Sequence, residues 1–142
     1  MTDGHGKHTL PVLLTDLAGR CFWSDRHWPT HDRGGMRLTG RVGCSSLRLR
    51  SSAPGYATDW HGAGEPVLVL VRRGVLRIEL RDGSARDFGP GDAFIAADAA
   101  VQSGDALIPE GCPEGHRARV IGDAPLEAVH VKLDPAGLNS DR

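Results

Sequence analysis

Alternation of apolar and polar residues is the clearest pattern along the chain, and its two-residue period is that of β-strands. Residues 46–50 (SLRLR) and 75–80 (VLRIEL) alternate, which is typical of strands with one buried face. Residues 67–71 (VLVLV) form a continuous apolar run that is rich in β-branched residues and too short for a typical helix. Further strands are predicted at residues 93–96, 118–121 and 128–133.

Turn-forming residues divide these segments into short elements. Asp82-Gly83 predicts a two-residue hairpin turn, because both residues tolerate positive φ. Other turn signals lie at residues 89–92, 109–115 and 122–123. The best helical segment, residues 12–18, extends for one or two turns only. Many short strands separated by turns predict an all-β sandwich or barrel.

The length of 142 residues fits a single domain with polar ends. We expect residues 1–10 to be a flexible N-terminal tail and residues 134–142 to be a C-terminal tail. Residues 36–133 are expected to form the barrel, and residues 11–35 an N-terminal strap across its mouth.

Charge and composition exclude several classes of partner. Lysine and arginine number 17 and aspartate and glutamate 18, a net charge of −1, so the basic excess of a nucleic-acid-binding protein is absent. No apolar run approaches the roughly 18 to 20 residues that span a bilayer, and no secretory signal pattern opens the chain. The three cysteines, Cys21, Cys44 and Cys112, form no CxxC pair, which favours reduced thiols in a cytoplasmic protein.

One segment carries a motif. Gly55 is followed after five residues by His61, Gly74 closes the next strand, and Gly89-Pro90-Gly91-Asp92 forms a turn further on. These residues resemble the first motif and the PGD turn of the cupin superfamily, small barrels whose lumen usually holds a metal. The resemblance covers residues 37–133. It implies a single-domain, all-β double-stranded β-helix, also called a cupin or jelly-roll barrel.

The chain departs from the cupin pattern at several ligand positions. Ala63 occupies the second histidine position of the first motif, and Val67 occupies the carboxylate position. The second motif fits in two registers. In one register Glu114 stands where a histidine is expected. In the other, which we favour, His116 faces the lumen and residues 99–114 are partly an inserted loop.

The resemblance implies a small-molecule ligand in the lumen. We expect a small-molecule enzyme of the lyase, isomerase or cyclase type, with His61 and His116 as general acid and base, because imidazole titrates near neutral pH. The residues expected to contact the substrate are Asp59, Trp60, Glu65 and Glu114.

Two alternatives stay open. In a metal-dependent cupin oxygenase, His61, His116 and Asp59 would form a two-histidine, one-carboxylate site, since Asp59 and His61 share one face of a strand. The cofactor is therefore undetermined, a divalent transition metal or none. A non-catalytic module that binds or senses a small molecule is the other alternative.

The segment of residues 21–32 concentrates aromatic residues and histidines. His27 and His31 are four apart, but Pro29 between them argues against one continuous helix. The aromatic residues here exceed what one small barrel readily covers, so we expect a homodimer. Three arginine pairs are expected on solvated strand faces: Arg48 with Arg50, Arg72 with Arg73, and Arg117 with Arg119.

Overall fold

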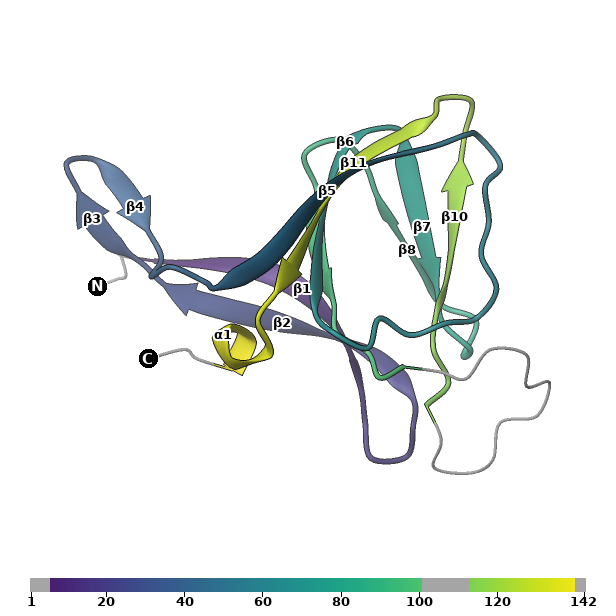
Figure 1. Cartoon of the computed structure of the whole chain (residues 1–142), viewed down its shortest axis with the longest axis horizontal. Helices are drawn as coiled ribbons and strands as arrows, with labels where there is room; N and C mark the ends of the chain where they lie inside the picture. The colour runs from purple at the N-terminus through teal and green to yellow at the C-terminus, as the bar shows by residue number, and fades with distance from the viewer. Residues whose placement is uncertain (1–5, 101–112, 140–142) are drawn as a thin grey trace.

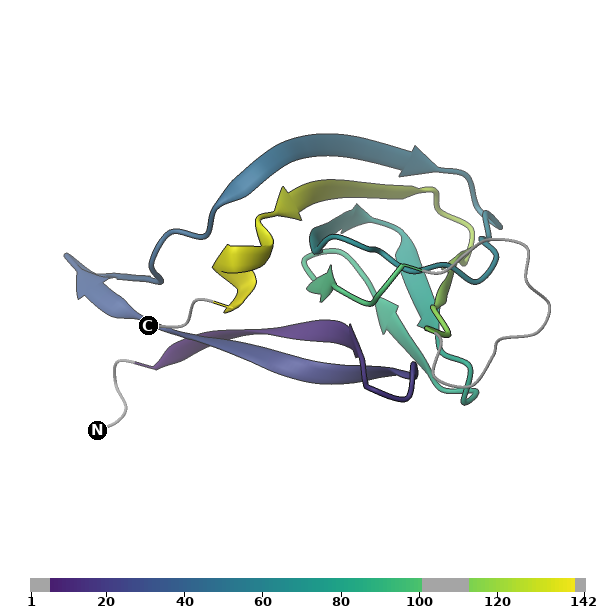
Figure 2. The same ribbon diagram turned by 60° about the horizontal axis from the view of Figure 1, so that its bottom comes forward.

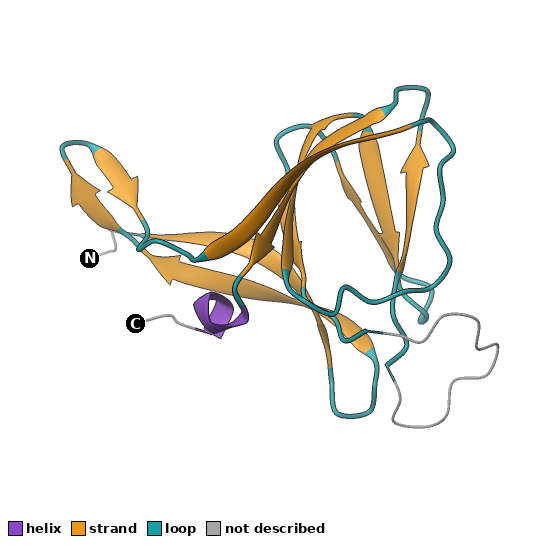
Figure 3. Cartoon of the chain, viewed as in Figure 1, coloured by secondary structure: helices purple, strands orange, loops and turns teal. Residues whose placement is uncertain are grey.

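The structure is a computed structural model that describes residues 6–100 and 113–139, nearly all of them in strands or the turns between them (Figure 3). The strands predicted from alternation are confirmed. In chain order the elements are β1 (Lys7–Thr15), β2 (Cys21–Pro29), β3 (His31–Arg33), β4 (Met36–Leu38), β5 (Cys44–Ser52), β6 (Val67–Arg73), β7 (Val75–Glu79), β8 (Ala85–Phe88), β9 (Ala93–Ala96), β10 (Arg117–Ile121), β11 (Leu126–Leu133) and α1 (Pro135–Asn139).

Two sheets face each other across the core (Figures 1 and 2). The larger sheet has six strands in the order β2-β1-β9-β6-β11-β5, and the smaller has three in the order β10-β7-β8. All pairings are antiparallel except that of β1 with β9. The predicted all-β, single-domain class is thereby confirmed.

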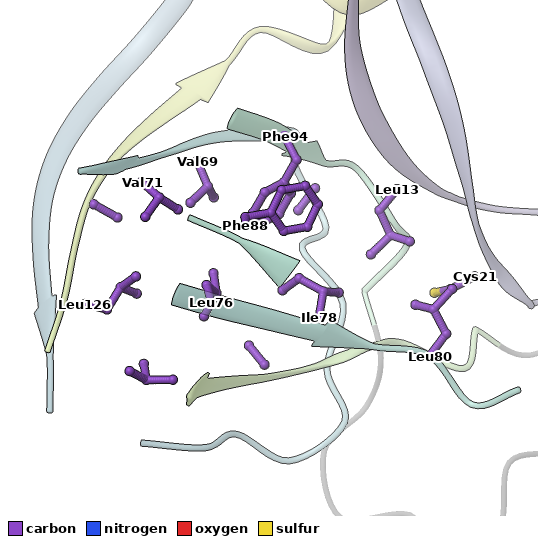
Figure 4. Close-up of a cluster of buried hydrophobic side chains, with 14 residues drawn as sticks. Leu13, Cys21, Val69, Val71, Leu76, Ile78, Leu80, Phe88, Phe94 and Leu126 are labelled. Atoms are coloured by element: carbon purple, nitrogen blue, oxygen red, sulfur yellow. The ribbon is translucent and has the colours of Figure 1, made fainter. Parts of the chain in front are cut away.

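The core lies between the inner faces of the two sheets (Figure 4). Leu76 and Ile78 alternate along β7 as the sequence predicts, and both are buried. Phe88 and Phe94 stack across the core with ring centroids 4.4 Å apart. Trp23 of β2 lies 5.5 Å from the Phe88 ring, so the N-terminal strands contribute to this core.

The N-terminal segment differs from expectation. β1 and β2 pair along their whole length, from Lys7 opposite Pro29 to Thr15 opposite Cys21. The helix predicted at residues 12–18 is wrong, because this pairing satisfies the backbone as a strand up to Thr15. Residues 7–10, expected in the flexible tail, belong to β1.

No strap crosses the barrel mouth in the described N-terminal segment. β2 is an edge of the large sheet, and the β3-β4 hairpin projects away from the barrel (Figure 1). His27 bonds Thr9 of β1, with 2.7 Å between Nδ1 and Oγ1, while His31 is exposed on β3. The structure therefore leaves these two histidines outside the lumen. In the expected C-terminal tail, α1 is held to β2 by a hydrogen bond of 2.8 Å from Arg26 Nε to Leu138 O.

The turn between β7 and β8 is one residue longer than predicted. Leu80 N donates to Ser84 O at 2.9 Å, so residues 81–83 form a three-residue loop. Gly83 alone in this loop has positive φ, at 91°. Asp82 shapes the loop through its carboxylate, which accepts the amide of Ser84 at 2.8 Å. No helix in the described residues is long and apolar enough to cross a membrane.

Candidate functional site

One wall of the lumen is formed by residues 53–66, which connect β5 to β6 and lie along β10. Thr58 N donates to Ala118 O at 2.9 Å, and Val120 N donates to Tyr56 O at 2.8 Å. Gly55 N also donates to Val120 O, at 3.2 Å. We call this ladder, between residues 55–61 and 116–120, the seam. The amide of Ala118 also donates to the Thr58 hydroxyl at 2.9 Å, and together these bonds place the first-motif segment beside the β10 strand.

The seam brings His61 and His116 together. The two residues exchange both main-chain hydrogen bonds, at 2.8 and 2.7 Å, and their ring centroids are 4.5 Å apart. Both side chains line the same cavity. In the described chain it is thus His116, and not Glu114, that faces the lumen beside the first-motif histidine.

Asp98 completes this pair and was missed by the sequence analysis. Its side chain is fully buried, and Oδ2 lies 2.7 Å from Nδ1 of His116. Its other oxygen accepts the amide of Ala63 at 3.3 Å. A single acidic residue within the apolar run of residues 93–101 was the available signal, because a buried carboxylate requires a partner.

The thiol of Cys21 also faces this carboxylate, with Sγ 3.6 Å from Asp98 Oδ2. Burial, and after it the charge of Asp98, raise the pKa of Cys21 to about 12. The thiol therefore stays protonated near neutral pH and donates to Asp98. A protonated buried thiol is a poor nucleophile, so Cys21 supports the site and does not itself attack a substrate.

Hydrogen bonds fix the tautomers of both imidazoles. Nδ1 of His61 lies 2.9 Å from the main-chain oxygen of Asp59, which can only accept, so this nitrogen carries the proton. Nδ1 of His116 likewise donates to the Asp98 carboxylate. Neither Nε2 has a hydrogen-bond partner among the described residues. Each ring therefore offers Nε2 to a ligand.

Gly62, next to His61, allows the seam to pack closely on the chain after Asp98. A Cβ atom at this position would overlap the carbonyl oxygen of Ala99. Gly64 continues the contact by donating its amide to the main-chain oxygen of Asp98 at 3.0 Å. Absence of a side chain at Gly62 thus helps to hold His61 and Asp98 on the same wall.

The cavity has a volume of about 330 Å³ and two kinds of wall. The larger part is apolar, contributed by Ala63, Val67, Val69, Leu76, Ile78, Phe94, Ala96 and Ala118. The polar part consists of Arg50, Tyr56, Thr58, His61, His116 and His130. A cavity of this size and composition suits a small molecule held by a few polar contacts.

Arg50 and His130 form a second polar group in the lumen that the sequence analysis did not single out. Arg50 lies on the lumen face of β5, contrary to the solvated position expected for it, and is half-buried. Burial lowers the pKa of the Arg50 guanidinium. The pKa of His130 is lowered by burial, and then by the charges of Arg50 and Arg48. His130 is consequently neutral near pH 7.

The other expected substrate contacts do not line the cavity. Asp59 has an exposed side chain and reaches His61 only through its main-chain oxygen. Trp60 points away, between the guanidinium groups of Arg81 and Arg117 at 4.2 and 4.8 Å from its ring. Glu65 is exposed and lies 3.7 Å from Lys132, and Glu114 is half-buried outside the lumen.

Comparisons with known proteins add information on fold. Neither a protein-family model nor a curated protein sequence matches the chain. A cupin-superfamily sugar phosphate isomerase from Silicibacter pomeroyi aligns at 23% identity and a TM-score of 0.43, over 62% of this chain and 49% of that protein. A cupin 2 conserved barrel domain protein from Salinispora arenicola aligns at 16% identity and a TM-score of 0.45, over 78% and 85% of the two chains.

A third structure, a cupin 2 conserved barrel domain protein from Rhodopseudomonas palustris, aligns at 14% identity and a TM-score of 0.46. It covers 93% of this chain and 74% of that one. At such identities the likeness concerns fold alone. The two facing, mostly antiparallel sheets are the all-β architecture that the resemblance to cupins predicts.

The ligand set of the lumen does not fit a metal. His61 and His116 supply two imidazole donors, whereas zinc, iron and manganese sites generally use at least three protein ligands. Ala63 and Val67, at the positions of the usual further ligands, line the cavity without a donor atom. Asp59 is exposed, and no group of three metal-binding side chains occurs among the described residues.

Proposed function

We propose that the chain is a small-molecule enzyme of the lyase, isomerase or cyclase type that transfers protons within its cupin lumen. The observation that carries this proposal is the His61–His116 pair on the wall of a 330 Å³ cavity, with ring centroids 4.5 Å apart. Neither Nε2 atom has a partner among the residues that the structure describes. Two imidazoles so placed can remove a proton from a bound molecule and deliver one to it.

The two histidines take different roles. The Asp98 carboxylate, 2.7 Å from Nδ1 of His116, stabilises the protonated form of that ring. We therefore assign one additional proton to the pair and place it on Nε2 of His116, which acts as the general acid. Neutral His61 is the base, and Nε2 accepts the proton that leaves the substrate. The pair carries one proton before and after the step, so no further reagent is needed.

Exchange of substrate hydrogen with D₂O tests the proposal. The protein is incubated in D₂O with a panel of neutral and anionic hydroxy-carbonyl compounds, and loss of their C–H signals is followed by proton NMR. We expect His61→Ala and His116→Ala each to slow the exchange of an active compound by about 10²-fold or more. The rate loss of the double variant should be far smaller than the product of the two single-variant losses, because the pair acts as a unit.

Asp59→Asn is the matched control, because only the main-chain oxygen of Asp59 contacts His61. Its exchange rate should stay within about twofold of wild type. Exchange that survives in both alanine variants would contradict the proposal. Binding of panel compounds without exchange would favour a binding module, and exchange that EDTA abolishes would favour a metal-dependent reaction.

A second measurement needs no substrate. Nitrogen-15 chemical shifts of the imidazole rings report the tautomer of each histidine. We expect neutral His61 to carry its proton on Nδ1, and His116 to keep a proton on Nδ1 toward Asp98. A proton on Nε2 alone in His116 would mean that Asp98 does not hold the ring as the mechanism requires.

A further inference from the structure

Arg50 lines the cavity, whereas four other arginines of the two sheets are held by carboxylates outside it. Arg73, Arg77, Arg117 and Arg119 each pair with a carboxylate at 3.5 Å or less. Within the part of the chain that the structure describes, Arg50 has no such pair. It bonds two neutral groups, the Ser52 hydroxyl at 3.0 Å from Nε and the His130 imidazole at 3.5 Å from Nη1.

No carboxylate of the described residues pairs with the charge of Arg50, which lines the cavity. The side chain is half-buried, and burial is unfavourable for a guanidinium that has no counter-ion. Its neighbours do not supply negative charge. Tyr56 lies beneath the guanidinium at 5.4 Å from its ring centroid, and His130 is neutral or positive at every pH. Arg48, on the same face of β5, adds a second positive charge nearby.

The hydrogen-bonding geometry of Arg50 leaves one edge available. Nε is used by Ser52, and Nη1 makes only a long contact with His130. Among the described residues Nη2 has no hydrogen-bond partner, so N–H groups of Nη1 and Nη2 remain available on a side chain that lines the cavity. Two parallel N–H donors match the two oxygens of a carboxylate or phosphate. A neutral or cationic ligand would leave both the charge and these donors unmatched.

We propose that Arg50 binds the oxyanion group, carboxylate or phosphate, of the small molecule that occupies the lumen. The inference rests on the proposed function, since Arg50 and the His61–His116 pair line one cavity. An anion held at Arg50 would fix one end of the molecule, so that its remaining atoms lie toward the two imidazoles. The substrate class is therefore a small anion with an acidic C–H bond.

Titration with inorganic phosphate at constant ionic strength tests the subsite. Ring signals of His130 in an NMR spectrum report binding, because this ring contacts Arg50. We expect saturable shifts in the wild-type protein and at least about tenfold weaker binding in Arg50→Met, which keeps the aliphatic stem and removes the charge. Arg48→Met, an exposed arginine of the same strand, should bind within about twofold of wild type.

Equal phosphate binding by Arg50→Met and wild type would overturn the proposal, as would equal losses in Arg50→Met and Arg48→Met, which would indicate diffuse charge attraction. If Arg50→Met does not fold, phenylglyoxal labelling of the wild-type chain decides. Phosphate should protect Arg50 and not Arg48, and absence of protection would refute the subsite.

Failure of the subsite and failure of the proposed function are distinguishable. His116→Ala removes the acid and leaves Arg50 in place, so it should bind phosphate like wild type while losing exchange activity. Phosphate binding that depends on Arg50, in a protein without exchange activity, would support the subsite alone. Exchange activity confined to neutral compounds would support the proton transfer and contradict the anion subsite.

Discussion

Asp98 shows how one residue can serve both the fold and the site. Its carboxylate is fully buried, yet it receives hydrogen bonds from His116, the Ala63 amide and the Cys21 thiol. Removing one partner of such a pair leaves the other polar group unsatisfied, which generally costs several kcal/mol. The orientation of His116 is therefore coupled to the stability of the wall on which it lies.

His130 gives a prediction on pH dependence. Its pKa in the folded chain is lowered below the ordinary value of 6.5, so the unfolded chain binds the proton first as pH falls. Above about pH 6.5 the ring is neutral in both the folded and the unfolded chain, and the folded chain keeps its full stability. Below about pH 6.5 protonation favours the unfolded chain, so the free energy of unfolding falls. Urea unfolding between about pH 7.5 and 5 should show wild type losing stability more steeply than His130→Gln, by at most about 1.4 kcal/mol per pH unit.

The exposed His31 provides the control, because it lies on β3 outside the cavity. His31→Gln should follow the wild-type curve. Superimposed curves for wild type and His130→Gln would mean that His130 is solvated and does not lie between the two arginines.

At the scale of elements, the β7-β8 hairpin depends on one backbone conformation. Gly83 has φ of 91°, and no atom lies within 4 Å of where its Cβ would be. Gly83→Val should therefore destabilise the chain through backbone strain alone, by about 1–2 kcal/mol. Urea unfolding measures this loss, and the shifts of the His61 and His116 rings should not change.

Gly40→Val is the matched variant for this test. Space around Gly40 is equally open, but its φ is not in the left-handed region. Its free energy of unfolding should stay within about 0.5 kcal/mol of wild type. A loss at Gly40 equal to that at Gly83 would show that chain stiffness and not φ is responsible.

At the scale of the whole molecule, the outer face of the large sheet is apolar. Leu49, Val129 and Leu70 are directly opposed across β5, β11 and β6, and Leu47, Val131 and Leu68 form the next row. Leu47 and Leu49 are 63% and 72% exposed. The expectation of a homodimer first rested on Phe22, Trp23 and Trp28. The two tryptophans lie largely inside the chain's own clusters, whereas Phe22 is exposed.

These leucine rows are the surface through which we predict a homodimer, since a two-fold pair would cover the same face on both chains. Light scattering should give the mass of a dimer for wild type at micromolar concentration and of a monomer for Leu49→Asp. Leu17→Asp, at the fully exposed turn between β1 and β2, should remain dimeric. A monomeric wild type would refute the prediction.

Alternation in the sequence predicts the strands but not which way each strand faces. At residues 46–50 it suggests buried leucines and solvated arginines, whereas the structure exposes Leu47 and Leu49 and places Arg50 in the lumen. Exposure of Leu47 and Leu49 shows that the described chain places no layer over the outer face of β5. Motif spacing in the sequence identified His61 and His116 as candidate site residues, each within its own segment.

Asp98 could not be assigned from spacing, because it lies beyond the end of β9 and its partner, His116, is 18 residues further along the chain. Contacts of this kind depend on how two walls pack, and local pattern does not encode them. Trp60 illustrates the opposite case. We expected it to contact the substrate, yet alternation next to His61 puts it on the opposite face of the chain, and the structure places it outside, between two arginines.

The seam has a consequence for how this barrel can change during evolution. Most of its hydrogen bonds join main-chain atoms, which every residue except proline possesses, so apart from the Thr58 hydroxyl and the close approach at Gly62 they leave side-chain identity free. Substitutions at lumen-facing positions whose side chains make no bond in the seam, such as Ala63, can therefore accumulate while the wall keeps its shape. A position such as Ala63 can thereby lose or gain a polar side chain, and with it a different chemistry, while the protein still folds.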